Sequence, residues 1–156
     1  MGTQDNACGT GGAACQICDS GTMCSLGQCV FNPFGMWRVV AFSASILPTD
    51  PNGQPWDSTP AYADPDPYVF MKIGSQTKYS SEKQDTLYPL WNEALIDASA
   101  LAIQSGLHVE IWDSDLLTNE LIGSCDPWVS DADLLNEVKT VTGCGRADIT
   151  LMFYVL

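Results

Sequence analysis

Short apolar runs separated by turn residues occupy the chain from residue 36 onward. In the run 107–112 (LHVEIW), Leu107, Val109 and Ile111 alternate with polar or aromatic residues. This period of two is typical of a strand with one face in a core and the other in solvent. Eight runs predict strands at residues 36–47, 68–73, 77–82, 92–100, 107–112, 121–125, 138–142 and 147–156. Short strands between frequent turn signals predict an all-β fold, an antiparallel sandwich of eight strands.

Two turns and one helix complete this pattern. Gly74-Ser75 predicts a turn between the second and third strands, and residues 143–146 (GCGR) predict a hairpin between the last two. Residues 130–136 (SDADLLN) predict a short helix, because Ser130 can cap its amino terminus and acids occupy its first turn. No other stretch holds a convincing helical period, so we expect one helix.

The composition changes at residues 31–35, and the segment before this point is rich in cysteine and glycine. It is too small to bury a core and must be held by cross-links. We therefore predict a disulfide-stapled segment and linker at residues 1–35 and the sandwich at residues 36–156. Such a density of cysteines is typical of an oxidising compartment, extracellular, periplasmic or at the cell surface. The cysteines of this segment are Cys8, Cys15, Cys18, Cys24 and Cys29.

The chain has seven cysteines, so at least one is free, intermolecular or paired with missing sequence. We expect disulfides at Cys15, Cys18, Cys24 and Cys29, and the fate of Cys8 stays open. A tetrathiolate zinc site at Cys15-x2-Cys18-x5-Cys24-x4-Cys29 is an alternative, since the spacing permits it.

Cys125 and Cys144 are the only cysteines after residue 35. They lie at the end of the sixth predicted strand and in the last hairpin, so we expect them to pair. The bond would close a loop of about 20 residues and stabilise the fold by roughly 3 kcal/mol. Two separate buried thiols are the alternative.

The charge of the chain excludes some functions. Nineteen acids against six bases give a net charge of −13, so the chain could not neutralise the phosphates of a nucleic acid. A metal cation, a basic protein or solubility explains the excess better. The single histidine, His108, is expected on an outward strand face, and no GxSxG or Gly-rich phosphate loop occurs. We predict that the chain is not an enzyme: counting acids leaves a two-carboxylate glycosidase open, but nothing in the sequence supplies the raised pKa of a general acid.

Five acids lie where predicted strands begin or end. Asp113 and Asp115 follow the strand 107–112, and Glu120 precedes the next strand; Asp50 follows the first strand and Asp66 precedes the second. Both loops can open at the same end of a sandwich, where five carboxylates would repel one another without a cation. Calcium accepts about six to eight oxygen ligands and suits such a set. A solvated acidic face is the alternative for Asp113 and Asp115 taken by themselves.

The stretches ILPTDPNG, DPYVFMKIG, TLYPLWNE, LHVEIWDSD and NELIG follow one another between residues 46 and 123. In this combination and order, residues 36–156 resemble the C2 domain, the calcium-dependent phospholipid-binding module also found in protein kinase C and the synaptotagmins. The resemblance implies a Greek-key sandwich. Because the first acidic loop follows the first strand directly, it implies the phospholipase C type of topology, with residues 36–47 as first strand and the chain ending in the opposite edge region.

In the C2 family, two loops supply aspartates that share calcium ions. The resemblance implies, as ligands here, the side chains of Asp50, Asp66, Asp113, Asp115 and Glu120 and the backbone carbonyls of Thr49 and Ser114. Two departures from the family pattern matter. The inserted residues 54–64 add Asp57 and Asp64 as competing ligands, and Glu120 stands for an aspartate in a loop one residue short, which would remove the outermost ion.

Two aromatic residues of the inserted loop, Trp56 and Tyr62, could enter a membrane interface or contact a ligand. The alternative is that they pack the loop onto the sandwich. Lys72, Lys78 and Lys83 lie around the second and third strands, where relatives often carry a basic lipid patch. Three lysines in a protein of charge −13 make a weak patch, so anionic lipid would have to be recruited through calcium.

We therefore predict a monomeric, calcium-binding module of a secreted or surface-anchored protein, which binds phospholipid or another anionic ligand through loop-bound calcium. The segment CGTGGAACQIC…GTMCSLGQCV also resembles short cysteine-rich modules in secreted proteins and lipoproteins of myxobacteria and their relatives. The alternative is a non-catalytic structural or protein-interaction domain of a bacterial surface lipoprotein, with an empty or purely structural metal rim. Outside the cell a calcium affinity on the order of 10⁻⁴ to 10⁻³ M would be useful.

Overall fold

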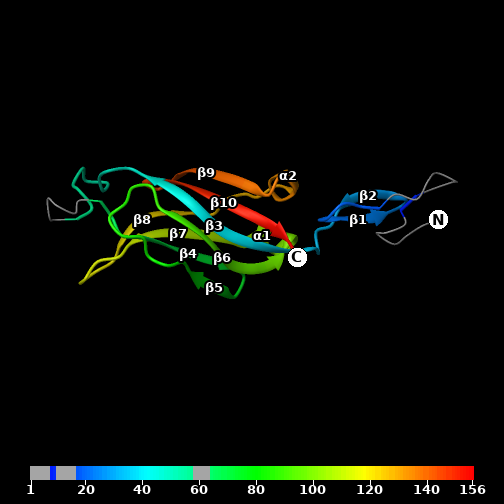
Figure 1. Cartoon of the computed structure of the whole chain (residues 1–156), viewed down its shortest axis with the longest axis horizontal. Helices are drawn as coiled ribbons and strands as arrows, with labels where there is room; N and C mark the ends of the chain where they lie inside the picture. Colours follow the sequence, from blue (N-terminus) through cyan, green and yellow to red (C-terminus); the bar gives the residue numbers. More distant parts are fainter. Residues whose placement is uncertain (1–7, 10–16, 58–63) are drawn as a thin grey trace.

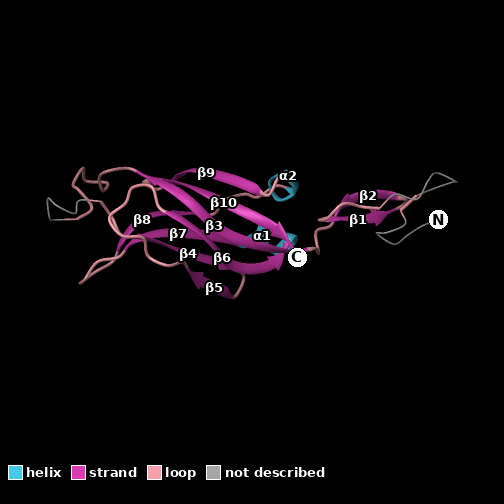
Figure 2. Ribbon diagram, viewed as in Figure 1, coloured by secondary structure: helices cyan, strands magenta, loops and turns pink. Residues whose placement is uncertain are grey.

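Two four-stranded antiparallel sheets pack face to face in the computed structural model, which describes residues 8–9, 17–57 and 64–156 (Figure 2). One sheet has the order β6-β3-β10-β9 and the other β5-β4-β7-β8, while β1 and β2 form a separate hairpin. The strands are β1 (Thr22–Ser25), β2 (Gln28–Phe31), β3 (Met36–Ile46), β4 (Pro67–Ile73), β5 (Gln76–Tyr79), β6 (Leu90–Ser99), β7 (Leu107–Asp113), β8 (Glu120–Cys125), β9 (Val138–Cys144) and β10 (Ala147–Val155), and the helices are α1 (Ala100–Gly106) and α2 (Asp131–Leu135). The eight strands predicted after residue 35 are all present.

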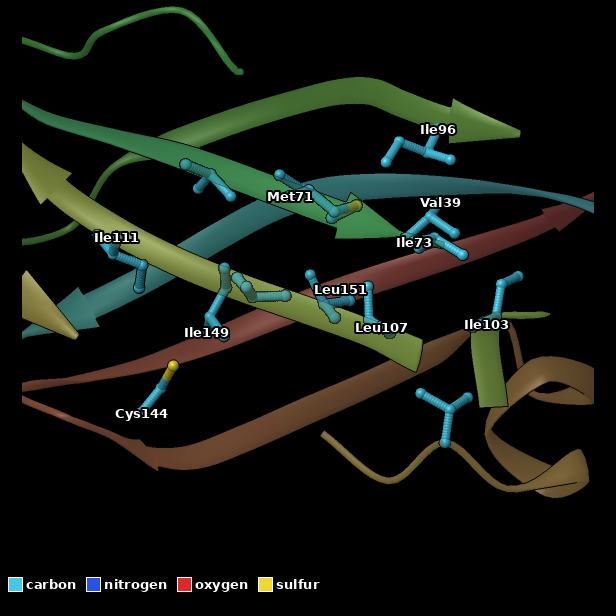
Figure 3. Packing of buried hydrophobic residues seen from close by; sticks show 14 of the residues in the cluster. Val39, Met71, Ile73, Ile96, Ile103, Leu107, Ile111, Cys144, Ile149 and Leu151 are labelled. Carbon is cyan, nitrogen blue, oxygen red and sulfur yellow. The ribbon is translucent and has the colours of Figure 1, made fainter. Parts of the chain in front are cut away.

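The core of the sandwich is built by alternate residues of the facing strands (Figure 3). On β7 the inward residues Leu107, Val109 and Ile111 are buried, and on β10 Ile149 and Leu151 are buried. Each such side chain stabilises the fold by about 1.5 to 3 kcal/mol through removal of apolar surface from water. The period of two therefore decides which face of each strand is buried.

The order of the strands confirms the topology of the phospholipase C type. β3 is the first strand of the sandwich, and in the described residues β1 and β2 pair only with each other, so no earlier strand joins the sandwich. One expectation was wrong: the last strand, β10, does not lie at an edge. It pairs with β3 along residues 147–155 on one side and with β9 on the other, because the hairpin to β9 and the long register with β3 both require a central place.

The expected helix is present as α2. Ser130 is its N-cap, and the capping box is complete, since the Ser130 hydroxyl accepts from Asp133 N and the Asp133 carboxylate accepts from Ser130 N. A second helix, α1, was not predicted. It has only seven residues and buries only Ala100 and Ile103, which is too little periodicity to stand out from a strand end.

The cysteine-rich segment is cross-linked as expected, although the pairing differs in one respect. Disulfides join Cys8 to Cys24 and Cys18 to Cys29, so Cys8 has a partner, and Cys15 lies outside the described residues. The Sγ atoms of Cys8, Cys18 and Cys29 lie within 4.8 Å of one another. Because these thiols are oxidised in pairs, Cys18, Cys24 and Cys29 cannot serve as the zinc thiolates of the alternative hypothesis.

In the sandwich, Cys125 and Cys144 form the expected disulfide, with Cα atoms 5.2 Å apart. It joins the last residue of β8 to the last residue of β9, and Arg146 N donates to Ile122 O at 2.9 Å beside it. The two backbones pass so closely here that a Cβ on Gly123 would overlap the carbonyl group of Cys144. The two sheets are thus fastened at this point by a covalent bond and by the absence of a side chain.

The cysteine-rich hairpin packs against one end of the sandwich. The ring of Phe31 stacks on Trp37 with centroids 6.5 Å apart, and Gly21 lies against Trp37 and Leu135. The loops that follow β3, β5 and β7 lie at the opposite end (Figure 1). In the described residues, none of the helices has the length and apolarity that a membrane crossing requires.

Candidate metal centre

Three loops lie at the end of the sandwich that faces away from the cysteine-rich hairpin (Figure 1): the first is described at residues 47–57 and 64–66, the second at 80–89 and the third at 114–119. The first and third loops border an open cleft of about 470 Å³, called the acidic cleft below. The residues that line it are Asp57, Asp66, Ser114, Asp115, Leu116, Leu117, Thr118 and Glu120. Its polar lining consists of oxygen-bearing side chains, the donors that calcium prefers.

Asp113, the last residue of β7, lies under this cleft and is fully buried. Its Oδ1 accepts from Asp66 N at 2.7 Å, but its buried Oδ2 has no hydrogen-bond partner among the described residues. The pKa of Asp113 is raised to about 6. Burial is the largest cause, and the nearby carboxylates of Asp115, Asp57 and Asp66 raise it further, while the hydrogen bond from Asp66 N lowers it. A buried carboxylate with an unpaired oxygen calls for a proton or a cation.

Asp66 links all three loops. Its backbone N–H donates to Asp113, its carbonyl accepts from Ser114 N at 3.1 Å, and its Oδ1 accepts from Asp85 N at 2.6 Å. Asp85 in the second loop has a positive φ of 49°, which lets its N–H turn toward Asp66. Asp85 belongs to no recognisable spacing of acids in the sequence, so it was not predicted as a site residue.

The third loop carries Asp115 and continues into β8 at Glu120. Glu120 is the cross-strand partner of Asp113, so the register of β7 and β8 brings it to the cleft. Asn119 holds the loop in place: its Oδ1 accepts from Asp115 N at 3.2 Å and its Nδ2 donates to Tyr68 Oη at 2.9 Å. Asp66, Ser114, Asp115 and Glu120 thus line one cleft above Asp113.

Asp50 does not line the cleft. Its Oδ1 accepts from Asn52 N at 2.8 Å and Gln54 N at 2.7 Å, and these hydrogen bonds, with the one from Gln54 the strongest, lower its pKa. Thr49 is also engaged elsewhere, since its carbonyl accepts from Arg146 Nε at 3.0 Å and its hydroxyl from the same guanidinium at 2.9 Å. In this structure Thr49 and Asp50 shape their own loop and stand apart from the acids that the resemblance groups with them.

Asp57, from the inserted part of the first loop, lines the cleft, whereas Asp50, which was expected there, does not. Burial raises its pKa, and the carboxylates of Asp115, Asp66 and Asp85 raise it further, so Asp57 shares the same negative field. The sequence suggested Asp57 only as a competing calcium ligand. Asp64 is described but does not line the cleft.

The indole of Trp56 holds the inserted loop against the sandwich. Trp56 is 5% exposed, and its Nε1 donates to Leu47 O at 2.7 Å. Its predicted role at a membrane or ligand is therefore replaced by the packing alternative, and Tyr62 lies outside the described residues. Leu116 and Leu117, in the third loop, are almost completely exposed, and Leu47 and Tyr88 of the other two loops are also exposed.

The carboxylates of the cleft are spread more widely than a filled calcium shell. In the described ranges, one group of three or more metal-binding side chains has all its donor atoms within 4.8 Å of one another, and that group is Cys8, Cys18 and Cys29. Mutual repulsion favours such a spacing, because none of the ion pairs in the described residues involves these five acids. The donor chemistry fits calcium, and binding would draw the loops together.

The charge pattern away from the cleft adds little. Lys72 and Lys78 are exposed on the second sheet, and Lys83 Nζ lies 3.4 Å from Glu93 Oε1, so the weak basic patch is weaker still.

His108 is not an isolated surface residue: its Nδ1 lies 2.7 Å from Asp126 Oδ1 and its Nε2 lies 3.0 Å from Glu110 Oε1. Hydrogen bonds to Glu110 and then Asp126 raise its pKa.

The raised pKa of Asp113 contradicts the prediction that no residue of the chain has the raised pKa that a general acid needs. A general acid must nevertheless reach the group that it protonates. Asp113 is 0% exposed, so it cannot contact a leaving group in this structure. The elevated pKa therefore fits a carboxylate that binds a cation better than it fits acid catalysis.

An antiparallel sandwich of this topology, with acids gathered on the loops at one end, is the arrangement that the resemblance to the C2 domain implied. The family model of the C2 domain matches residues 35–141, and the chain belongs to the C2 domain family. That family is generally non-catalytic. A comparison with curated proteins gives no significant match.

Solved structures share the fold. A structure of extended synaptotagmin 2 that contains its A and B C2 domains is 21% identical, with a TM-score of 0.57, and the match covers 85% of this chain and 46% of that one. Its calcium-bound form is also 21% identical, with a TM-score of 0.54, covering 80% of this chain and 46% of that chain. The A-type C2 domain of plant extended synaptotagmin 1 is 19% identical, with a TM-score of 0.56 over 80% of this chain and 95% of that chain. This chain thus spans about half of the extended synaptotagmin 2 chains, and at these identities the likeness concerns the fold.

Proposed function

We propose that this chain is a calcium-dependent binding module that attaches a secreted or surface-anchored protein to phospholipid or another anionic ligand. The observation that carries the proposal is the buried Oδ2 of Asp113, which has no hydrogen-bond partner in the part of the chain that the structure describes, beneath a cleft lined by further carboxylates. The family and the calcium-bound neighbour support the choice of calcium. The three disulfides support an oxidising compartment.

The side chains that would hold calcium are Asp57, Asp66, Asp113, Asp115 and Glu120, and the Ser114 carbonyl is a further donor. When bound, calcium supplies positive charge that the phosphate oxygens of a lipid can share. Asp113 orients the site, because its hydrogen bond to Asp66 N ties the third loop to the first. Asp50 and Thr49 act indirectly by holding the first loop, unless this loop rearranges on binding.

The third loop would also touch the membrane. Leu116 and Leu117 stand at its tip with 103% and 96% exposure, beside the carboxylates of the cleft. Apolar side chains at such a tip gain free energy when they enter the boundary between headgroups and acyl chains. Neutralisation of the adjacent acids would have to come first, since an anionic bilayer repels a bare acidic cleft.

Calorimetric titration of calcium into chelator-treated protein, followed by sedimentation with anionic vesicles, tests the proposal. We expect calcium binding with a dissociation constant on the order of 10⁻⁴ to 10⁻³ M and calcium-dependent sedimentation. The paired substitution Leu116→Ser with Leu117→Ser should weaken sedimentation and leave calcium binding intact. Calcium binding without any sedimentation would favour the alternative, a calcium-rigidified structural domain, and absence of both would refute the metal centre.

A further inference from the structure

Two hollows adjoin each other beside α1 and α2, at the end of the sandwich that lies opposite the acidic cleft (Figure 1). Their volumes are about 430 and 260 Å³, and Gln104 and Trp128 line both of them. The larger hollow also contains Asp131, and the smaller one also contains Asp126. We call these two hollows and the shared indole the Trp128 surface.

The fold leaves the Trp128 side chain in solvent between two buried neighbours. Pro127 and Val129 are buried, whereas Trp128 is 74% exposed. Among the described residues no hydrogen bond reaches Trp128, so its indole N–H is left for solvent or for a partner. Tryptophan has few rotatable bonds to immobilise when a partner covers it, and it is enriched at the centres of protein interfaces. An exposed indole with a hollow on each side is therefore a candidate anchor for a partner.

The hydrogen-bond donors of the Trp128 surface are largely used within the chain. Gln104 Nε2 donates to Asp131 Oδ1 at 2.7 Å, and the hydroxyls of Ser105 and Ser130 donate to a backbone carbonyl and a carboxylate at 2.7 Å each. The acceptors are left over, since Oδ2 of Asp131, Oδ2 of Asp126 and Oε1 of Gln104 have no hydrogen-bond partner in the described residues. A ligand that brings several donors fits this lining.

The charge of the Trp128 surface favours a cation. Asp126 and Asp131 lie one in each hollow, and neither lining contains a lysine or an arginine of the described chain. In the described residues, the ion pairs of these two acids are limited to that of Asp126 with His108, which is charged only when the imidazole is protonated. The chain as a whole has a net charge of −13. A second copy of the chain would be repelled from this surface, whereas a basic segment would be attracted to it.

We propose that the Trp128 surface binds a basic segment of a partner protein, with the guanidinium group of an arginine against the indole of Trp128. A guanidinium has five N–H donors and no acceptor, stacks on aromatic faces and pairs with carboxylates through its planar fork. Two arginines, one in each hollow, would reach Asp126 and Asp131 on the two sides of the indole. The Trp128 surface shares no lining residue with the acidic cleft, so this binding does not rest on the proposed function. The partner protein and the ligand of the acidic cleft would then be held at opposite ends of the sandwich.

Titration with an acetylated and amidated octapeptide of alternating arginine and alanine tests the proposal. The assay contains a calcium chelator and little salt, and its pH is alkaline so that His108 is neutral. Calorimetry gives the affinity, and NMR of the Trp128 indole N–H, assigned with Trp128→Ala, reports binding at this surface. We expect a dissociation constant on the order of 10⁻⁴ M, with the corresponding lysine peptide binding at least about 3-fold more weakly because an ammonium group does not stack on the indole.

Three substitutions and one further control locate the peptide. Trp128→Ala should weaken binding of the arginine peptide about 10-fold. Asp131→Asn should weaken it about 2- to 5-fold, because an amide oxygen can still accept from Gln104 but the charge is lost. The matched control Tyr88→Ala removes an aromatic side chain that is also 74% exposed, and Glu82→Gln removes one exposed charge, both in the second loop at the opposite end. Neither control should change the affinity.

Unchanged affinity in Trp128→Ala, or equal affinity for the arginine and lysine peptides, would overturn the proposal. Loss of binding in Asp115→Asn without loss in Trp128→Ala would also overturn it, because the peptide would then lie in the acidic cleft. Maltohexaose serves as a neutral probe of the same indole. A shift of the Trp128 resonance by maltohexaose and not by the arginine peptide would show a carbohydrate site in place of a site for a basic segment.

Discussion

The two ends of the sandwich each bury one polar atom that has no hydrogen-bond partner in the described residues, and the two atoms differ in their surroundings. At the cysteine-rich end it is Trp37 Nε1, a neutral donor beside the Phe31 ring and Gly21. At the acidic end it is Asp113 Oδ2, which belongs to a carboxyl group surrounded by other acids. An unpaired N–H costs about 1 to 3 kcal/mol and can be outweighed by packing, whereas an unpaired buried carboxylate needs a proton or a cation.

Acids at the cysteine-rich end show that the difference is not one of composition. Asp133 accepts from Ser130 N at 2.8 Å and from Lys139 Nζ at 3.0 Å, and Asp131 accepts from Gln104 Nε2 at 2.7 Å. These acids are satisfied within the chain, so they are structural. Asp113 differs because the carboxylates of Asp115, Asp57 and Asp66 lie near it and, after burial, raise its pKa, so these acids together indicate a ligand site.

The largest effect is expected at the cysteine-rich end. Trp37→Ala should lower the free energy of unfolding by about 3 to 5 kcal/mol, because it removes a large buried side chain between the hairpin and the sandwich. Urea denaturation measures the change. Trp128→Ala, in an exposed position, should cost less than about 0.5 kcal/mol. A small loss for Trp37→Ala would mean that the hairpin does not contribute to the core.

Calcium should act on the acidic end alone. At about 100 times its dissociation constant it should stabilise the fold by about 2.7 kcal/mol and raise the melting temperature by about 8 °C. Asp113→Asn with Asp115→Asn should abolish the rise, and without calcium this variant should melt no lower than the unsubstituted protein, because it has less repulsion. Magnesium should substitute poorly, since it demands near-ideal octahedral geometry. An unchanged melting temperature, or an equal shift with magnesium, would contradict the specific site.

The stability of the metal-free protein should depend on pH through Asp113. Its folded pKa of about 6 lies above its usual value of 3.8, so the folded state binds the proton more tightly than the unfolded state. Stability should therefore fall by about 2 kcal/mol as pH rises from about 4 to about 6. Asp113→Asn should remove that part of the slope in chelator-treated protein, measured by urea denaturation at several pH values. An identical slope in the variant would show that the carboxyl group is not buried without a cation.

The smallest effect separates two acids of the first loop. Asp57→Asn should weaken calcium binding about 10-fold, because it removes charge from the cleft, and Asp50→Asn should weaken it less than about 2-fold. Isothermal titration of both variants is the measurement, and each variant is the control for the other. The reverse order would mean that the first loop rearranges so that Asp50 becomes a ligand.

The arrangement of strands was accessible from the sequence, because alternation of apolar and polar residues is a local property that survives in the fold. The strand 107–112, the turn at Gly74 and the cap at Ser130 all follow from neighbours in the chain. The family motifs added the topology and three aspartates that the structure brings together at the candidate metal centre, Asp66, Asp113 and Asp115. The helix α1 was missed because seven residues carry too little periodic signal.

Contacts between distant residues decided the rest. Arg146 donates a hydrogen bond to the carbonyl of Thr49, 97 positions away in the sequence, and the indole of Trp56 donates one to the carbonyl of Leu47. With the first loop held in this way, Asp57 and not Asp50 lines the cleft. The side chains of β4, β5 and β7 on the outer face of their sheet likewise come together only through the register of these strands. Local patterns determine where strands lie and which face is buried, since those depend on nearest neighbours. The path of a loop depends on which remote donors satisfy its backbone, and that becomes defined only when the sheets have packed.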